Sequence, residues 1–168
     1  VPFTEEAPKA LQKLAEVDEV AGERVSWGTE LRWGRTSVTA RVTGVLPCYE
    51  RIRSHEARPG GRFLNDEDQR LSRRVIFLGP ELKDRLFGGA EAIGQTVFLR
   101  GVPFTVAGVM VNKLQNSSYG GMDVDKASIP LSTFEGLYGS APDPVLVYAV
   151  NPGVRGKEIE KDVRAALA

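Results

Sequence analysis

Apolar and polar positions alternate along much of the chain, and this pattern predicts a succession of short strands. Residues 25–33 and 37–45 are rich in β-branched and aromatic side chains and flank Gly34-Arg35, which predicts a hairpin. From Val38 to Gly44 every second residue is small or apolar, as in a half-buried strand. Further strands are predicted at 73–78, 96–100, 104–111, 127–130 and 145–150.

Helical periodicity and capping signals predict helices between these strands and at both chain ends. Pro80 follows a glycine and suits the first position of a helix. Ser132 with Glu135 three residues later is a capping-box signature, and Asp66-Glu67-Asp68 after Asn65 could cap one helical turn. The predicted helices cover about 4–15, 80–87, 132–137 and 156–167.

This order of elements predicts an α+β domain. The helix and strands at the front and the strand–helix–strand–helix series at the back favour one split α/β lobe, formed by residues 1–46 and 126–168. The middle of the chain, residues 47–125, is richer in predicted strands and in glycine, and we interpret it as an inserted β-rich lobe.

Composition excludes several classes of protein. The chain has 168 residues, 42% of them hydrophobic, and a net charge of zero, which removes the electrostatic argument for a nucleic-acid-binding protein. The single Cys48 excludes an internal disulfide and a Cys-rich zinc site, and the single His55 excludes two-histidine metal motifs. No apolar run approaches the roughly 20 residues of a membrane-spanning helix. Because the chain starts at Val1 rather than Met, we expect a soluble piece of a larger protein.

No residue pattern predicts a catalyst. His55 is the first candidate for a general base, but its charged neighbours from Arg53 to Arg58 favour a solvated surface histidine. Cys48 lies between Pro47 and Tyr49, which give no reason for an activated thiol, so a partly buried small residue is favoured.

Two groups of carboxylates could hold a hard cation. Asp66-Glu67-Asp68 and Asp123-Val124-Asp125 both fail the test for a calcium loop, because phenylalanine would stand where a bidentate glutamate is required. Helix capping is favoured for the first group and turn formation for the second. The sequence therefore assigns no catalytic, cofactor-binding or metal-ligating residue, and no cofactor.

Charge is unevenly distributed along the sequence. Residues 51–74 are locally basic, with seven arginines, and residues 1–30 are acidic. Such asymmetry could pair two subdomains or orient a partner, but a solvated surface is the favoured interpretation.

An ordered series of short motifs resembles the periplasmic core domain of MacB-type ABC transporter permeases, a group related to FtsX and the lipoprotein-release permeases. The resemblance covers about residues 17–134, and the last thirty-odd residues match in pattern more than in motif. The motifs are GVLPCYERIR (44–53), GRFLN (61–65), RRVIFLG (73–79), DRLFGG (84–89), AIGQTVFLRGVPFTVAGVM (92–110) and IPLSTF (129–134).

The resemblance implies a split α/β lobe similar to the porter domains of multidrug pumps, carrying the inserted β-rich lobe. It further implies a dimeric inner-membrane permease, driven by an ABC ATPase whose hydrolysis takes place on a separate cytoplasmic domain or subunit. The domain itself would be non-catalytic and would lie in the periplasm or extracytoplasmic space. It would couple movement of membrane helices to partner or substrate handling in efflux or in lipoprotein or peptide export.

The resemblance also implies partners. These are a second permease copy, the ATPase, and in Gram-negative relatives a periplasmic adaptor leading to an outer-membrane duct; no nucleic acid is expected. The segment 112–123, NKLQNSSYGGMD, is the expected partner-facing surface. The extended reading frame should show one membrane helix before Val1 and three after Ala168.

Two alternatives from other classes stay open. A metal-assisted hydrolase would use His55 with Asp66 or Asp68. A free-standing periplasmic binding module would capture a small molecule or peptide, and it predicts a well-formed apolar pocket between the two lobes.

Overall fold

The computed structural model describes residues 17–53, 55–112, 123–139 and 145–150, the first and last six of these by backbone alone. The strands are β1 (Val17–Trp33), β2 (Thr36–Val45), β3 (Val75–Leu78), β4 (Thr96–Leu99), β5 (Val102–Val109), β6 (Lys126–Pro130) and β7 (Val145–Val150). The helices are α2 (Tyr49–Arg53), α3 (Asp66–Arg70), α4 (Pro80–Phe87) and α6 (Leu131–Tyr138). The predicted helices at 4–15 and 156–167 and the segment 113–122 lie outside the described residues.

Six of the strands form one closed sheet. Their order is β2-β6-β3-β5-β4-β1, and β1 pairs with β2 to close the ring. The sheet is mixed, because β2–β6 and β3–β5 are parallel pairs and the other pairs are antiparallel. The predicted α+β class is confirmed. Strands from both predicted lobes share this sheet, and the division of the chain into two lobes stays a prediction.

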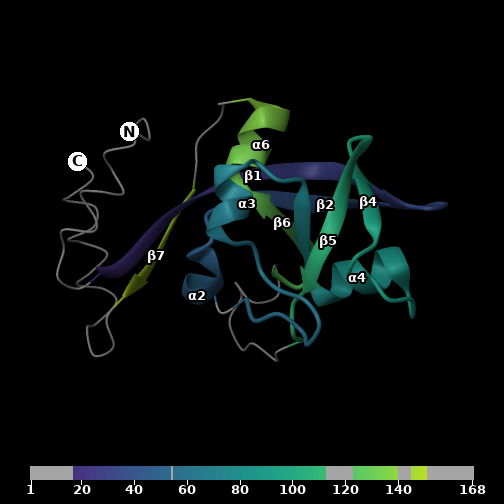
Figure 1. Cartoon of the computed structure of the whole chain (residues 1–168), viewed down its shortest axis with the longest axis horizontal. Coiled ribbons are helices and arrows are strands. Elements are labelled where there is room, and N and C mark those ends of the chain that lie inside the picture. The colour runs from purple at the N-terminus through teal and green to yellow at the C-terminus, as the bar shows by residue number, and fades with distance from the viewer. Residues whose placement is uncertain (1–16, 54, 113–122, 140–144, 151–168) are drawn as a thin grey trace.

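The longest strand, β1, belongs to both the ring and an arm beside it. Its first part pairs with β7, from Val17 opposite Val150 to Glu23 opposite Val145, and its last part pairs with β4. Figure 1 shows β1 extending along the long axis of the molecule, with β7 near one end and α4 near the other. A strand of 17 residues spans roughly 55 Å at about 3.3 Å per residue.

The main core fills the ring. Alternate residues of each strand point inward and are almost completely buried, and α4 and α6 add Leu82, Leu86 and Phe134. The strand residues of this core are Leu31, Ala40, Val42, Ile76, Leu78, Val97, Leu99, Phe104, Val106, Val109, Ala127 and Ile129. Because inward-facing residues come from all six strands, the ring is filled by side chains rather than hollow.

A second, smaller core lies on the outer side of β2 and β3. Val45 and Phe77 project there and are covered by Tyr49 of α2 and by the segment that carries Phe63 and Leu64. This second core explains why the last residues of β2 are buried on both faces rather than in alternation.

Local capping agrees with the sequence in one helix and differs in another. The helical turn predicted at Asp66-Glu67-Asp68 is α3; its N-cap is Asn65, which forms a capping box with Asp68. In α6 the predicted Ser132 cap is wrong, because the N-cap is Pro130, two residues earlier, and the helix begins at Leu131. Ser132 instead donates from its hydroxyl to the backbone oxygen of Gln69, at 2.6 Å.

Candidate functional site

His55 is not on the surface, contrary to the sequence prediction. Only 2% of the residue is exposed, and its ring packs against Tyr49, Phe63 and Phe77, with centroid distances of 5.1, 5.8 and 6.2 Å. The charged neighbours in sequence misled the prediction, because the residues that bury His55 come from α2, β3 and the segment before α3. Among the described residues, neither ring nitrogen has a hydrogen-bond partner.

Asp123 is the carboxylate that faces this histidine. Arg53 donates to its Oδ2 at 2.7 Å, and the ammonium of Lys126 lies 2.9 Å from Oδ1. His55 Nε2 lies 3.3 Å from Oδ2, and Arg41 lies 3.6 Å from Oδ1. Burial alone would raise the pKa of Asp123, but contact with His55 and the charge of Lys126 outweigh burial and hold this pKa well below its usual range.

A second carboxylate, Glu23 of β1, enters the same cluster through Tyr49. The Tyr49 hydroxyl donates to Glu23 at 2.9 Å and accepts a hydrogen bond from Lys126 at 2.7 Å. Burial, and then the charge of Glu23, raise the pKa of Tyr49 far above its usual value, so this residue stays a neutral phenol. Burial lowers the pKa of Lys126, while Glu23 and Asp123 oppose that shift.

We call these residues the ionic cluster. It joins β1, β2, α2 and β6 to the turn before β6. Its members are Glu23, Arg41, Tyr49, Arg53, His55, Asp123 and Lys126.

The chemistry of the ionic cluster favours a structural connection over catalysis. Both carboxylates are in contact with cationic side chains, so neither presents open oxygen ligands to a metal ion. Within the described ranges, no group of three or more His, Cys, Asp or Glu side chains could hold a metal.

The pairing required by the metal-assisted hydrolase is not formed. His55 faces Asp123, whereas Asp68 binds Arg62 at 2.6 Å and the backbone N–H of Asn65 at 3.0 Å. Asp66 is exposed at the first position of α3.

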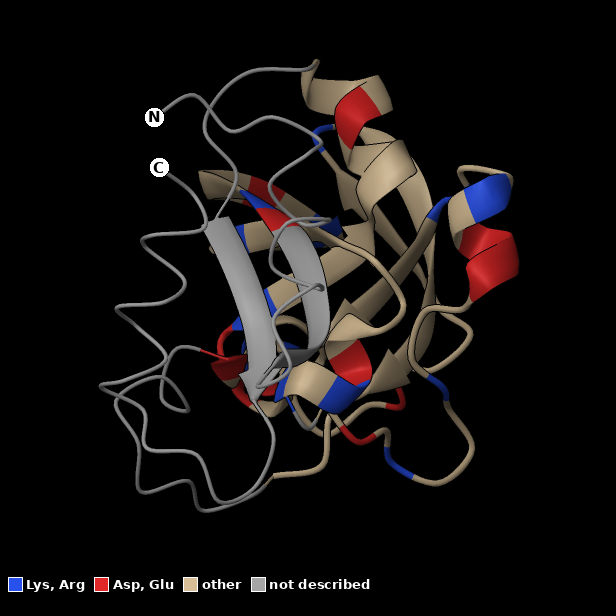
Figure 2. Cartoon of the chain, turned by 90° about the vertical axis from the view of Figure 1, so that its left-hand side faces the viewer, with Lys and Arg blue, Asp and Glu red and all other residues tan. Residues whose placement is uncertain are grey.

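Ion pairs also offset much of the basic charge between residues 51 and 74. Arg62 and Arg73 pair with Asp68, and Arg70 and Arg73 pair with Glu67. Figure 2 shows acidic and basic residues interspersed on the described part of one face of the molecule. This arrangement agrees with the interpretation of a solvated surface.

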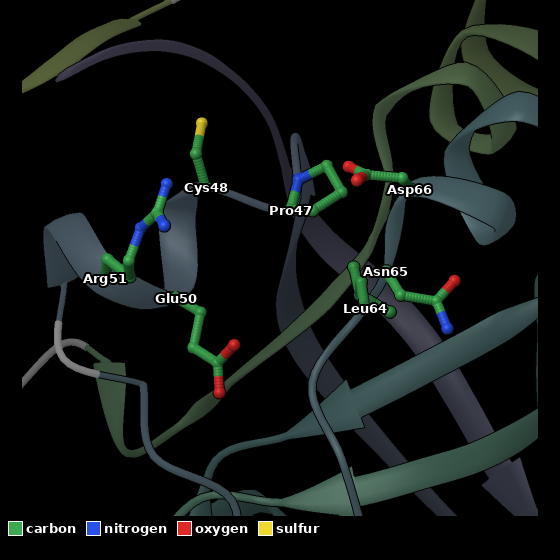
Figure 3. A pocket seen from close by; sticks show the side chains of 7 residues that line it. All are labelled: Pro47, Cys48, Glu50, Arg51, Leu64, Asn65 and Asp66. Atoms are coloured by element: carbon green, nitrogen blue, oxygen red, sulfur yellow. The ribbon is translucent and has the colours of Figure 1, made fainter.

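A pocket of about 310 Å³ lies between α2 and the start of α3. Figure 3 shows its lining side chains, which come from the two sides of the opening: Pro47, Cys48, Glu50, Arg51, Leu64, Asn65 and Asp66. Cys48 is half-buried here, as predicted. Because four of the seven lining residues carry charged or amide side chains, this pocket differs from the apolar pocket that a small-molecule binding module predicts.

The ionic cluster could not be predicted from the sequence. Glu23, Tyr49 and Lys126 lie far apart in the chain, and only Tyr49 belongs to one of the family motifs, GVLPCYERIR (44–53). The one local signal is Lys126 itself, a charged residue directly before the small and apolar residues 127–130. The structure buries Lys126 together with the rest of β6.

The fold is similar to solved extracytoplasmic domains of ABC-type transporters. The periplasmic region of MacB from Actinobacillus actinomycetemcomitans superposes with a TM-score of 0.76 and 22% identity, over 96% of this chain and 71% of that one. The extracellular domain of the noncanonic ABC-type transporter YknZ from Gram-positive bacteria superposes with a TM-score of 0.73 and 21% identity, over 95% of this chain and 77% of that one.

Sequence comparison defines the family. The profile described as MacB-like periplasmic core domain matches residues 1–166. The macrolide export ATP-binding/permease protein MacB of Chromobacterium violaceum is 30% identical over 159 residues, which is 94% of this chain and 24% of that protein. MacB of Neisseria gonorrhoeae is 31% identical over 108 residues, or 64% of this chain and 16% of that protein.

The chain therefore belongs to the MacB-like periplasmic core domain family, as its motifs predicted. It spans less than a quarter of the length of the curated relatives it matches. In the part of the chain that the structure describes, no helix is both long and apolar enough to cross a membrane.

Proposed function

We propose that this chain is the extracytoplasmic lever of a MacB/FtsX-like ABC permease. In this proposal the domain is non-catalytic, lies outside the inner membrane, and couples ATP-driven movement of membrane helices to partner or substrate handling. ATP hydrolysis takes place on a cytoplasmic domain or subunit. The transport would be efflux, or export of a lipoprotein or a peptide.

The course of β1 is the observation that carries this proposal. The described chain runs from Val17 into the ring and returns along β7 to Val150, directly opposite Val17 in the antiparallel register. One strand, which has a bulge between Ser26 and Thr29, therefore connects this point with the β1–β2 turn at the far end of the ring. Displacement of the β1–β7 pair would move the ring as one body, because close-packed interiors transmit strain.

The partners follow from the family and belong to the same proposal. They are a second copy of the permease, which makes the intact transporter a homodimer, and the ABC ATPase. A periplasmic adaptor or an outer-membrane duct is a further partner where the cell has an outer membrane. The split α/β lobe and the inserted lobe would move together in this arrangement.

The test separates ATP hydrolysis from movement outside the membrane. A two-glycine insertion after Gly22, within the part of β1 that pairs with β7, should uncouple the lever in the intact transporter. Two residues preserve the alternation of side chains beyond the insertion, so the ring can still form. The matched control is the same insertion after Gly101, an exposed turn residue between β4 and β5.

The measurement uses a spin label on Leu71→Cys, in a background in which Cys48 is replaced by Ser. Leu71 is 49% exposed, so the label should not disturb the core. Pulsed electron resonance between the two copies should give a distance that changes when a non-hydrolysable ATP analogue binds. The Gly22 insertion should abolish this change while ATPase activity persists, and the Gly101 insertion should keep both. A nucleotide-dependent change that survives the Gly22 insertion, or is missing from the unmodified transporter, would refute the lever.

A further inference from the structure

The surroundings of His55 differ on its two sides. On one side lie Phe63 and Phe77, which offer no hydrogen-bond partner to a charged imidazole. On the other side lies the Asp123 carboxylate, which is shared with Arg53 and Lys126. A proton added to His55 would therefore create a fourth cation around one carboxylate, beside Arg53, Lys126 and Arg41.

The charged or titratable groups around His55 come from α2, β6 and the turn before β6, whereas β3 and the segment before α3 supply the apolar Phe77 and Phe63. The turn before β6 and β6 itself supply Asp123 and Lys126, and α2 supplies Tyr49 and Arg53. Two further members act at one remove: Glu23 of β1 through Tyr49, and Arg41 of β2 through Asp123.

We propose that His55 is an acid-sensitive latch, whose protonation weakens the contacts between α2 and the Asp123 turn and releases α2 from the ring. The inference goes beyond the lever function and does not depend on it, because it concerns two conformations of this chain alone.

The Asp123 turn is the fixed side of this latch. Val124 accepts hydrogen bonds from the N–H groups of Glu81 and Leu82 at the start of α4, at 2.9 and 3.3 Å. The N–H of Gly79 donates to Lys126 at 2.8 Å. These backbone bonds hold the turn to the ring without help from the ionic cluster.

The moving side is α2. It has only five residues, and isolated helices of that length are not stable in water. Tyr49 and Arg53 attach it to the cluster through side chains, and the N–H of His55 donates to Glu50 at 2.9 Å, which ties the histidine to the helix. Loss of the side-chain contacts would therefore release α2 and His55 together.

The direction of the pH effect follows from comparing two conformations. In the closed state α2 is packed on the ring, and in the open state α2 and His55 are released. Burial lowers the pKa of His55 in the closed state; Asp123 opposes this shift, while Lys126 and Arg53 add to it. In the open state the imidazole meets water and takes up a proton near its ordinary pKa, about 6.5. The closed state is thus favoured above that pH, and its advantage falls by up to about tenfold per pH unit below it, until the pH reaches the lowered pKa of the closed state.

Glu50 acts in the opposite sense on the same helix. Burial raises its pKa, against a smaller effect of Arg51, so acid strengthens the closed state through this residue. The Glu50→Gln variant removes this opposing contribution and should make the effect of His55 larger. Comparison of this variant with the unmodified chain also separates the contribution of Glu50 to the pH dependence from that of His55.

Nuclear magnetic resonance on the untagged chain tests the latch directly, because His55 is the only histidine. Its imidazole signals should titrate with a midpoint below about 6.5. Hydrogen-exchange protection of the α2 amides, corrected for intrinsic exchange rates, should fall by up to about fivefold between about pH 6.5 and about pH 5.5. Amides of the β4–β5 hairpin serve as the internal reference and should keep their protection.

The His55→Phe variant keeps the aromatic packing and removes the titration, so the protection of its α2 should not change over this interval. His55→Gln provides the same test with a polar side chain if the phenylalanine variant folds poorly. A His55 midpoint at or above the ordinary value would overturn the proposal. So would an equal loss of α2 protection in both variants, or an equal loss of protection in α2 and in the β4–β5 hairpin of the unmodified chain.

Discussion

At the scale of single residues, buried charges in this chain are held by shared partners, and Asp123 has the most. Its carboxylate contacts Arg53, Lys126, His55 and Arg41 while only 3% of the residue is exposed. Removing one partner of a buried ion pair is costly, because the charge left behind stays desolvated. The ionic cluster should therefore be more sensitive to loss of this one carboxylate than to changes at its exposed neighbours.

Asp123→Asn tests this dependence. The variant leaves Arg53 and Lys126 without the shared carboxylate charge, and we expect a loss of about 3 kcal/mol in the free energy of unfolding at neutral pH. Asp125→Asn is the matched control, because its salt bridge with Arg85 is exposed and should contribute less than about 1 kcal/mol. Urea unfolding at neutral pH measures both losses. Similar losses in the two variants would contradict the role of Asp123 as the shared buried carboxylate of the ionic cluster.

Asp123→Asn should also change how the free energy of unfolding depends on pH in acid. Because the folded-state pKa of Asp123 lies well below the ordinary value, its contribution to stability is present above about pH 4 and is lost as the pH falls further. Asp123→Asn should lack this part of the pH profile, whereas Asp125→Asn should keep it. The acid-sensitive range lies below that of His55, so the two effects can be resolved in one titration.

At the scale of elements, one close approach fixes α4 relative to β6. Gly79 lies between β3 and α4, and a Cβ atom at this position would overlap the carbonyl oxygens of Asp123 and Val124. Backbone oxygens cannot move aside as a flexible side chain can. The glycine therefore sets how closely the start of α4 packs against the turn that carries Asp123.

Gly79→Ala should consequently lower the free energy of unfolding by about 2 kcal/mol or more. Gly89→Ala is the control, because nothing lies within 4 Å of a Cβ there and the backbone is not in the left-handed region. Thermal and urea unfolding of both variants measure the difference. If Gly79→Ala were as stable as Gly89→Ala, the close approach would have no energetic importance.

Single helices and strands also show which parts of the fold the sequence could predict. Alternation, turn residues and capping signals located the β1–β2 hairpin, α4 and the helical turn of α3, because these signals are local. The parallel pairing of β2 with β6 joins residues more than eighty positions apart, and no local signal specifies it. His55 was misplaced for the same reason, since Phe63, Phe77 and Asp123 bury it from other parts of the chain.

At the scale of the whole molecule, the described surface offers little apolar area for a strong self-association. The large hydrophobic side chains exposed in the described ranges are Trp27, at 68%, and Leu71, at 49%. Trp27 lies on a bulge of β1, beside Gly28, whose φ of 69° is in the left-handed region. The Arg41 guanidinium lies 5.3 Å from the centre of the Trp27 ring, so this indole makes a cation–π contact within the chain.

We therefore expect the isolated chain to be monomeric or weakly dimeric at micromolar concentration. Permanent interfaces usually bury about 2,000 Å² or more and are rich in apolar residues, and two separate side chains do not provide such a surface. Sedimentation velocity of the isolated chain measures its mass, and the Trp27→Ala and Leu71→Ala variants should sediment as the unmodified chain does. A tight dimer that persists on dilution would mean that the extracytoplasmic domains hold the two permease copies together themselves. In that case movement of the membrane helices would have to act against this interface, and the lever would need a hinge within each copy.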